Sequence, residues 1–345
     1  MQHGSPYGIH RVIEPHGVLP QGAWKIDNTM EICDNEILIN VSALNIDAAS
    51  FTQIKKEAGG DLGKIEATIR SIVAQRGKHH NPVTGSGGML IGSVAQIGPI
   101  LAGKIDLKVG DKIATLVSLS LTPLRIDAVQ AIHVDRDQVE IAGQAILFET
   151  GLYAKLPSDI PEKLALAILD VAGAPAQTAR LVKPGDTVVV IGGGGKSGTL
   201  CVYEARKQAG PAGCVIGVSP FEKDCERMRK LGWVNHALQV DATNALAMME
   251  AVSAVTGGRL ADVVINCVNI QNTEMGSILA TRDGGKIYFF SMATSFTAAA
   301  LGAEGVGKDV EMIVGNGYAK GHAELSLNLL RESATLRQLF EELYV

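Results

Sequence analysis

The segment TVVVIGGGGKSGTL, residues 187–200, decides the fold of this 345-residue chain. Its apolar start, residues 187–191, predicts a buried strand, and its end predicts the first turn of a helix. Between them Gly193, Gly195 and Gly198 follow the spacing GxGxxG. The first glycine permits a tight turn, the second lets the backbone approach a pyrophosphate, and the third lets the helix pack against the strand. The segment therefore predicts a dinucleotide-binding loop at a helix N-terminus.

The two halves of the chain have different patterns. Residues 1–157 predict mainly strands and turns, such as the alternating segment EILINVS at 36–42, together with a helix at 56–75. After residue 157, strands rich in Val and Ile alternate with helices, which indicates a parallel sheet covered on both faces. We expect these strands at residues 187–191, 214–218, 237–240, 263–268 and 286–290.

Composition and charge narrow the class of protein. Hydrophobic residues make up 46% and charged residues 19%, which is typical of a folded globular protein. The net charge of −5 argues against nucleic-acid binding, and no apolar run is long enough to span a membrane. The five cysteines form no CxxC pair, and the N-terminus lacks the pattern of a signal peptide. We therefore expect a reduced, cytoplasmic setting.

The strand at 214–218 ends at Ser219, where an acidic residue would bind the ribose 2′-hydroxyl of NAD. A small hydroxyl residue followed by Lys223, Arg227 and Arg229 suits a 2′-phosphate instead. We therefore favour NADP over NAD as the cofactor. The alternative is that the three cations form a solvated helix face, as charge runs usually do.

Four segments resemble the medium-chain dehydrogenase/reductase superfamily: VGDKIATL at 109–116, KPGDTVVVIGGGGKSG at 183–198, LADVVINCVN at 260–269 and RDGGKIYFF at 282–290. The resemblance implies an α/β protein with a GroES-like strand-rich barrel domain over residues 1–157. It implies a Rossmann domain with a doubly wound parallel sheet over 158–315, and a return of residues 316–345 to the first domain. An active cleft between the domains and a homodimer are further implications.

The resemblance also suggests which residues contact the cofactor. Lys196 would add charge near the phosphates, Asn269 would approach the adenosine half, and Ser291 and Met292 would approach the nicotinamide. The full expected set is Gly193, Gly194, Gly195, Lys196, Ser197, Gly198, Ser219, Lys223, Asn269, Ser291 and Met292.

Zinc-binding members of this superfamily carry three catalytic ligand positions, which this chain fills differently. The positions fall on Asn45, on Gly85-Ser86-Gly87 and on Asp170. A catalytic zinc needs at least three protein ligands, and only one carboxylate is left here. We therefore predict that the enzyme works without a metal.

Hydride transfer without a metal suits an amine, because carboxylates stabilise the cationic iminium that forms. Under the resemblance, Asp47 and Asp170 face the cleft, where either can hold an ammonium group or accept its proton. The alternative for Asp47 is a turn or helix cap, whereas Asp170 ends an apolar helix, where an unpaired carboxylate is costly. His79 and His80 are alternative bases, although a histidine on a loop is more often solvated.

Three further segments resemble the L-erythro-3,5-diaminohexanoate dehydrogenase family of anaerobic lysine fermentation: HGSPYGIHRVIEPHGVLPQGAWKID at 3–27, VSALNIDAASF at 41–51 and GSGGMLIGSV at 85–94. The resemblance implies that the 3-amino group of a small diamino acid leaves as ammonia, giving 5-amino-3-oxohexanoate and reduced cofactor. The substrate carboxylate then needs a cation. The expected catalytic residues are Asp170, Asp47 and Asn45, and the expected substrate contacts are Ser86, Arg125 and Arg76, with Lys78 as a further cation.

Two other functions remain open. Asn45 within ALNID, residues 43–47, resembles a segment of zinc-free quinone and enoyl reductases, which use NADPH. An apolar pocket would favour that reading, and carboxylates in the pocket favour the amine dehydrogenase. A third reading is an NADPH-binding protein without turnover.

Overall fold

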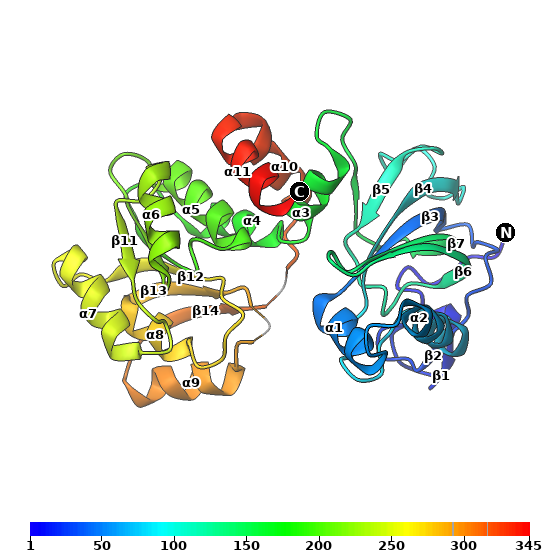
Figure 1. Ribbon diagram of the computed structural model, residues 1–345, viewed down its shortest axis with the longest axis horizontal. Coiled ribbons are helices and arrows are strands. Elements are labelled where there is room, and N and C mark those ends of the chain that lie inside the picture. The colour runs from blue at the N-terminus through cyan, green and yellow to red at the C-terminus, as the bar shows by residue number, and fades with distance from the viewer. Residues whose placement is uncertain (292, 316) are drawn as a thin grey trace. The chain divides into compact units, whose positions relative to one another are not determined.

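The computed structural model describes residues 1–291, 293–315 and 317–345. The chain folds into two compact units, Met1–Glu162 and Lys163–Val345, each built on its own six-stranded sheet (Figure 1). Among the described residues, no helix has both the length and the apolar character needed to cross a membrane.

The first unit is built on an antiparallel sheet with the strand order β6-β7-β3-β4-β5-β8. Its long strand β3 pairs with β7 on one side and with β4 on the other. The strands β1 and β2 pair separately. The elements are η1 (Ile9–Arg11), β1 (Val12–Glu14), β2 (Lys25–Ile26), β3 (Glu36–Ile46), α1 (Ala48–Glu57), α2 (Leu62–Arg76), β4 (Gly88–Ile97), β5 (Lys112–Thr115), β6 (Leu124–His133), β7 (Gln138–Phe148) and β8 (Tyr153–Lys155).

The helices α1 and α2 contribute apolar side chains to the core of this unit. Ile65, Ile69 and Ile72 recur at helical spacing along α2, and all three are buried in the same cluster as β3. The sequence predicts a single helix at 56–75, and the structure has two instead. Gly59 and Gly60 have φ values of +61° and +80°, which end α1, and α2 then begins with a new cap.

The second unit is built on a parallel sheet with the order β11-β10-β9-β12-β13-β14. The strand and helix alternation after residue 157 that the sequence predicts is confirmed. The elements are α3 (Glu162–Leu169), α4 (Gly173–Leu181), β9 (Thr187–Ile191), α5 (Lys196–Ala209), β10 (Cys214–Ser219), α6 (Glu222–Leu231), β11 (His236–Gln239), α7 (Ala245–Thr256), β12 (Ala261–Asn266), α8 (Glu274–Ala280), β13 (Thr281–Phe289), α9 (Phe296–Gly305), β14 (Val310–Val314), α10 (His322–Glu332) and α11 (Ala334–Tyr344).

Strand β9 lies in the middle of this sheet and is buried on both faces. Val188 and Val190 pack in one cluster with residues of α4 and α5, whereas Val189 and Ile191 pack in another with residues of α7, α8 and α9. Figure 1 shows these helices on opposite sides of the sheet. The continuous apolar run at 187–191 therefore reflects two helical layers, one on each face.

The terminal helices α10 and α11 lie in the second unit. Ser326 Oγ on α10 donates to the carbonyl of Ala172 at 3.0 Å, and Lys207 on α5 pairs with Glu332 at 2.8 Å. The resemblance led us to expect that residues 316–345 return to the first domain and that the boundary follows residue 157. The compact units are divided after Glu162, and the terminal helices are held by α5 and the start of α4.

Candidate functional site

The glycine loop, residues 192–195, connects β9 to α5. Gly192 has a φ of +80°, and its N–H donates to the carbonyl of Val218 on the neighbouring strand β10 at 2.8 Å. A Cβ on Gly198 would lie 1.9 Å from the carbonyl oxygen of Gly192. Glycine is therefore required at position 198 for the close approach of α5 to the loop.

The N-terminus of α5 presents backbone donors that no side chain caps. Gly195 is the N-cap residue, and no side-chain hydrogen bond is made there. A Cβ on Gly193 would lie 2.7 Å from Met228 Sδ, and one on Gly194 would lie 2.5 Å from Asp224 Cβ. The loop thus packs closely against α6 while the first turn of α5 stays available for an anion, which fits a pyrophosphate.

An acidic side chain that the sequence analysis missed lies beside this loop. Ser219 is buried at the end of β10, and its Oγ donates to Asp224 Oδ2 at 2.9 Å. Arg227 donates to Asp224 Oδ1 at 2.8 Å and also to the carbonyl of Gly194. Asp224 follows the strand end by five residues, so a search for an acid at position 219 does not find it. The i, i+3 spacing of Asp224 and Arg227 at the start of a helix was the available signal.

The other two cations predicted to bind a 2′-phosphate, Lys223 and Arg229, lie instead on a solvated face of α6. Lys223 is exposed, with Nζ 5.8 Å from the centre of the Phe221 ring. Arg229 is exposed and pairs with Glu222.

Two predicted residues of the second unit lie side by side at the start of α5. Lys196 Nζ is 2.8 Å from Asp170 Oδ2, and the Asp170 side chain, directly after α3, is 56% exposed. From the sequence alone, an unpaired carboxylate at the end of an apolar helix was expected to be costly. The structure removes that cost, because Asp170 is half solvated and its charge is balanced by Lys196.

Two other predicted cofactor contacts meet at the ends of neighbouring strands. Asn269 follows β12 and Ser291 follows β13, and Ser291 Oγ donates to Asn269 Oδ1 at 3.1 Å. Parallel strands place their carboxyl ends at one edge of the sheet, where ligands of such folds bind. Ser197 is buried in the first turn of α5. Met292 lies outside the described residues.

In the first unit, Asn45 and Asp47 lie at the end of β3. Asp47 is the N-cap of α1, and its Oδ1 accepts from the N–H of Ala49 at 3.0 Å and from Ser86 Oγ at 3.2 Å. Asp47 is therefore a helix cap, as the alternative interpretation predicts. The same carboxylate also contacts Ser86, a predicted substrate-binding residue. Asn45 Oδ1 accepts from Gln138 Nε2 at 2.9 Å.

A chain of three hydroxyls, formed by Ser86, Ser50 and Thr84, ends at Asp47. Ser50 Oγ is 2.6 Å from the oxygens of both Ser86 and Thr84, which are 3.0 Å from each other. A carboxylate only accepts, so Ser86 donates to Asp47 and its oxygen is left to accept from its neighbours. The sequence analysis missed Ser50 and Thr84, because nothing in their spacing shows that they meet.

The candidate cations for the substrate carboxylate, Arg125 and Lys78, differ in burial. Arg125 is exposed on β6 and donates to Asp127 at 2.9 Å and Gln144 at 2.8 Å. Lys78 is fully buried, donates to the carbonyl of Pro20, and has a pKa lowered to about 8 by burial and by the nearby charge of Arg76.

His79 and His80 are not solvated loop residues, contrary to expectation. His79 is fully buried, and burial lowers its pKa to about 4. His80 is partly buried, and burial, followed by the charges of Lys78 and Arg76, lowers its pKa to about 4. Both rings are therefore neutral at pH 7 and are weak proton acceptors.

His10, Cys33 and Glu36 form a group of possible metal ligands in the first unit, away from the superfamily's zinc positions in the sequence. Arg11 donates at 2.7 Å to each oxygen of Glu36, so a guanidinium already neutralises that carboxylate. Although burial raises it, hydrogen bonds from Arg11 and His10 hold the pKa of Glu36 at about 2. A cation would have to compete with Arg11. The absence of a catalytic metal stays a prediction.

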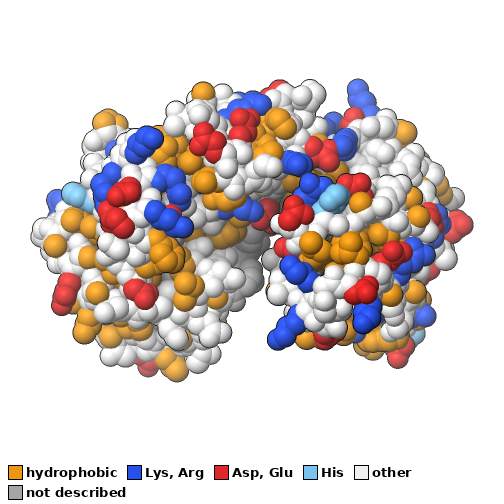
Figure 2. Space-filling view, in the orientation of Figure 1, with side chains coloured by type: hydrophobic (Ala, Val, Ile, Leu, Met, Phe, Trp, Pro, Cys, Tyr) orange, Lys and Arg blue, Asp and Glu red, His pale blue; other side chains and the backbone are white. Residues whose placement is uncertain are grey.

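The surface of each unit carries charges of both signs. On the face in Figure 2, Lys and Arg side chains are interspersed with Asp and Glu side chains over both units. Together with the net charge of −5, this surface does not favour a nucleic-acid partner.

Comparison with known proteins places the chain among named enzymes. Residues 10–157 match the L-erythro-3,5-diaminohexanoate dehydrogenase N-terminal domain family. The L-erythro-3,5-diaminohexanoate dehydrogenase of Acetoanaerobium sticklandii is 61% identical over 342 residues, which are 99% of each chain. The enzyme of the same name from Fusobacterium nucleatum subsp. nucleatum is 60% identical over 345 residues, which are 100% of each chain.

Solved structures with the same fold are much less similar in sequence. A mycobacterial protein complexed with NADPH superposes with a TM-score of 0.55 at 16% identity, covering 89% of this chain and 83% of that one. A likeness at this identity shows the fold alone. The fold class expected from the sequence, a GroES-like strand-rich domain and a Rossmann domain, is confirmed.

Proposed function

The chain belongs to the L-erythro-3,5-diaminohexanoate dehydrogenase family, and on that premise we propose that it oxidatively deaminates L-erythro-3,5-diaminohexanoate. The products are 5-amino-3-oxohexanoate, ammonium and a reduced nicotinamide cofactor, as in lysine fermentation. The observation that carries the proposal is the identity of 60–61% with two dehydrogenases of that name along the whole chain. The zinc-free quinone and enoyl reductase reading has no comparable support.

The glycine loop and the N-terminus of α5 would hold the pyrophosphate of the cofactor, with Lys196 adding positive charge there. Asn269 would approach the adenosine half, and Ser291 would approach the nicotinamide, as the resemblance implies. When bound, the nicotinamide accepts a hydride from the substrate carbon that carries the amine.

The side chain of Asp224 bears on the choice between NAD and NADP. The sequence favours NADP because Ser219 is not acidic, but Asp224 supplies a carboxylate 2.9 Å from Ser219 Oγ. A carboxylate accepts a hydrogen bond from a ribose 2′-hydroxyl and repels a 2′-phosphate. Asp224 also forms an ion pair with Arg227, which is the cation that would otherwise bind such a phosphate. We therefore propose NAD as the preferred cofactor.

Asp47 is our candidate for the general base. The 3-ammonium group must lose a proton before its nitrogen can share a lone pair with the carbon that loses hydride. The iminium that results is cationic, so a carboxylate also stabilises it. Water then adds to the iminium carbon, and ammonia leaves to give the ketone. Asn45, two residues before Asp47 and hydrogen-bonded by Gln138, would help to orient the amine.

The hydroxyl chain can adjust its hydrogen bonds to both protonation states of Asp47. Each hydroxyl pair in the chain can be donor or acceptor in either direction. When Asp47 is protonated, its O–H can donate a hydrogen bond to Ser86, and Ser86 can donate to Ser50 or Thr84 instead. The proton itself leaves Asp47 to water, because Asp47 is exposed. Substrate contact by Ser86 is compatible with this role.

Asp170 is the second candidate carboxylate, and its geometry suggests a different role. Its charge is balanced by Lys196 at 2.8 Å, whereas no Lys, Arg or His of the described residues lies within 4 Å of the Asp47 carboxylate. We propose that Asp170 orients Lys196 beside the cofactor phosphates and contributes negative charge for the substrate's ammonium groups. For the substrate carboxylate, Arg125 and Arg76 remain the candidates, and Arg76 is discussed below.

The proposal is tested by a turnover assay on the purified protein. We expect L-erythro-3,5-diaminohexanoate to reduce NAD, followed by near-ultraviolet absorbance, with NADP the poorer cofactor. Parallel reactions contain NADPH with a quinone or an enoyl thioester. Oxidation of NADPH by those acceptors, without turnover of the diamino acid, would replace the proposal with the reductase reading. Failure of every reaction, in protein that binds NAD, would point to a binding protein.

A further inference from the structure

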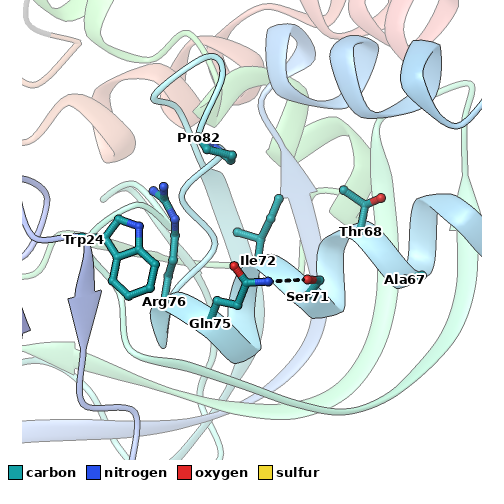
Figure 3. A pocket seen from close by; sticks show the side chains of 8 residues that line it. All are labelled: Trp24, Ala67, Thr68, Ser71, Ile72, Gln75, Arg76 and Pro82. Atoms are coloured by element: carbon teal, nitrogen blue, oxygen red, sulfur yellow. Dashed lines mark hydrogen bonds between the residues drawn. The ribbon is translucent and has the colours of Figure 1, made fainter.

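A pocket of about 430 Å³ lies on the outer face of α2 in the first unit (Figure 3). Trp24 stands at one end, and the side chains of α2 form the floor. Thr68, Ser71, Ile72, Gln75 and Arg76 recur at three- and four-residue spacing, so they lie on one helix face. The volume is that of a small-molecule site.

Arg76 is the charged group of this pocket, and the part of the chain that the structure describes offers it no acidic partner. No carboxylate of the described residues lies within 4 Å of its guanidinium, which lies 5.9 Å from the centre of the Trp24 ring. Arg76 is partly buried, and burial lowers its pKa. The nearby Lys78 donates its hydrogen bond to the carbonyl of Pro20. It therefore adds positive charge near Arg76 and supplies no negative charge to balance it.

The other side chains of the pocket do not satisfy this charge. Gln75 Nε2 donates to Ser71 Oγ at 2.9 Å, and Thr68 donates to the carbonyl of Lys64 at 2.9 Å. Trp24 is 45% exposed, and it offers, with Ile72, an apolar surface beside the guanidinium. The pocket thus combines one unneutralised cation with an apolar wall, which suits an anion that carries an apolar group.

We propose that this pocket binds a small carboxylate ligand with an apolar group, whose carboxylate pairs with Arg76 while its apolar part lies against Trp24 and Ile72. The carboxylate can come from two sources, the diamino acid substrate or a separate carboxylic acid that acts as an effector. Binding is measured without turnover, so failure of the proposed reaction leaves this inference standing, and the reverse also holds.

The chain has two tryptophans, so the variant Trp233→Phe leaves Trp24 as the single fluorescent indole. We titrate this variant with benzoate and with benzamide, which has a similar shape but no charge. We expect a saturable change of Trp24 fluorescence with benzoate and at least tenfold weaker binding of benzamide. Arg76→Gln in the same background should weaken benzoate binding at least tenfold, and Arg70→Gln, a change on the same helix outside the pocket, should leave it unchanged.

A second variant, Ser71→Phe, fills the pocket while keeping Arg76, and it should also abolish benzoate binding. This variant keeps the test valid if Arg76→Gln does not fold. Equal binding of benzoate and benzamide, a response that never saturates, or unchanged binding in either pocket variant would overturn the proposal.

A competition experiment between benzoate and the diamino acid identifies which carboxylate the pocket binds. If L-erythro-3,5-diaminohexanoate displaces benzoate, and Arg76→Gln raises its KM, the pocket holds the substrate's carboxylate. If benzoate binds but the diamino acid does not displace it, the pocket serves a separate carboxylic acid. Both results support the carboxylate site, and they assign it to different ligands.

Discussion

The glycine loop after β9 and the hydroxyl chain after β3 are built in different ways. The loop consists of backbone from one continuous segment, and its shape depends on the absence of side chains at Gly192 and Gly198. The hydroxyl chain consists of side chains from segments 34–36 residues apart, which meet through the pairing of β3 with β4. A backbone site is fixed by local sequence, whereas a side-chain site depends on the fold that brings its parts together.

This difference explains what the sequence could predict. The GxGxxG spacing and the apolar run before it predict the loop, β9 and α5, because each depends on neighbours along the chain. Asp47 and Ser86 were found only through the resemblance to known enzymes. Ser50 and Thr84 were missed, because a hydroxyl has no sequence signal until its partner is known.

The other errors in the sequence-based prediction have the same cause, except for one. Asp224 lies beside Ser219 only because α6 turns back over the loop, and that turn is not visible in the spacing of acids. The burial of His79 was also missed, because it depends on segments that are not adjacent in sequence. Gly87 lies close to the carbonyl of His79 and to the backbone of Leu119 and Ser120. The break between α1 and α2 does have a sequence signal, the pair Gly59-Gly60, although a single helix was predicted there.

The largest effect should come from breaking the side-chain site. Asp47→Asn keeps a capping side chain on α1 but removes the base, so kcat should fall by about 10²–10⁴-fold with NAD binding unchanged. Asp61→Asn is the matched control, because Asp61 caps α2 in the same way, outside the site. Steady-state kinetics measure both. A kcat within threefold of the wild type for Asp47→Asn would reduce Asp47 to its capping role.

Breaking the backbone site should have a smaller effect on a different quantity. A Cβ at Gly198 meets the carbonyl of Gly192, so Gly198→Ala should weaken NAD binding by about thirtyfold, or about 2 kcal/mol. At Gly305 on α9, outside the loop, a Cβ would meet no atom within 4 Å, so Gly305→Ala should bind NAD as the wild type does. Calorimetric titration with NAD distinguishes the two. Equal affinities would mean that the loop does not hold the cofactor.

Acid should destabilise the folded chain through His79, which lies in the same segment between α2 and β4 as Thr84 and Ser86. The pKa of His79 is lowered from 6.5 to about 4 in the folded chain, so the unfolded chain binds the proton first. Stability should be lost as pH falls from about 6.5 towards 4, by about 2 kcal/mol between pH 7 and pH 5. Urea unfolding at both pH values measures this loss.

The control for that measurement compares two histidines. His79→Leu should lose that share of the pH dependence, whereas His16→Gln, a change at an exposed position, should keep the wild-type slope. Identical slopes for the wild type and His79→Leu would contradict the buried, neutral state of His79.

The smallest effect should be a change of cofactor preference at the edge of the glycine loop. Asp224→Asn removes the negative charge and releases Arg227 for a 2′-phosphate. The ratio of kcat/KM for NADP to that for NAD should rise about tenfold, or about 1.4 kcal/mol. Glu222→Gln, which frees Arg229 on the exposed face of the same helix, should leave the ratio unchanged. An unchanged ratio in Asp224→Asn would show that Asp224 does not select between the two cofactors.

The measurement that tests the central claim most directly follows the hydrogen on the reacting carbon. L-erythro-3,5-diaminohexanoate labelled with deuterium at C3 is incubated with the protein and NAD, and mass spectrometry of the reduced cofactor is combined with an ammonium assay. The account predicts one deuterium in each reduced cofactor and one ammonium released for each cofactor reduced. Reduced cofactor without deuterium, or reduction without release of ammonium, would contradict it.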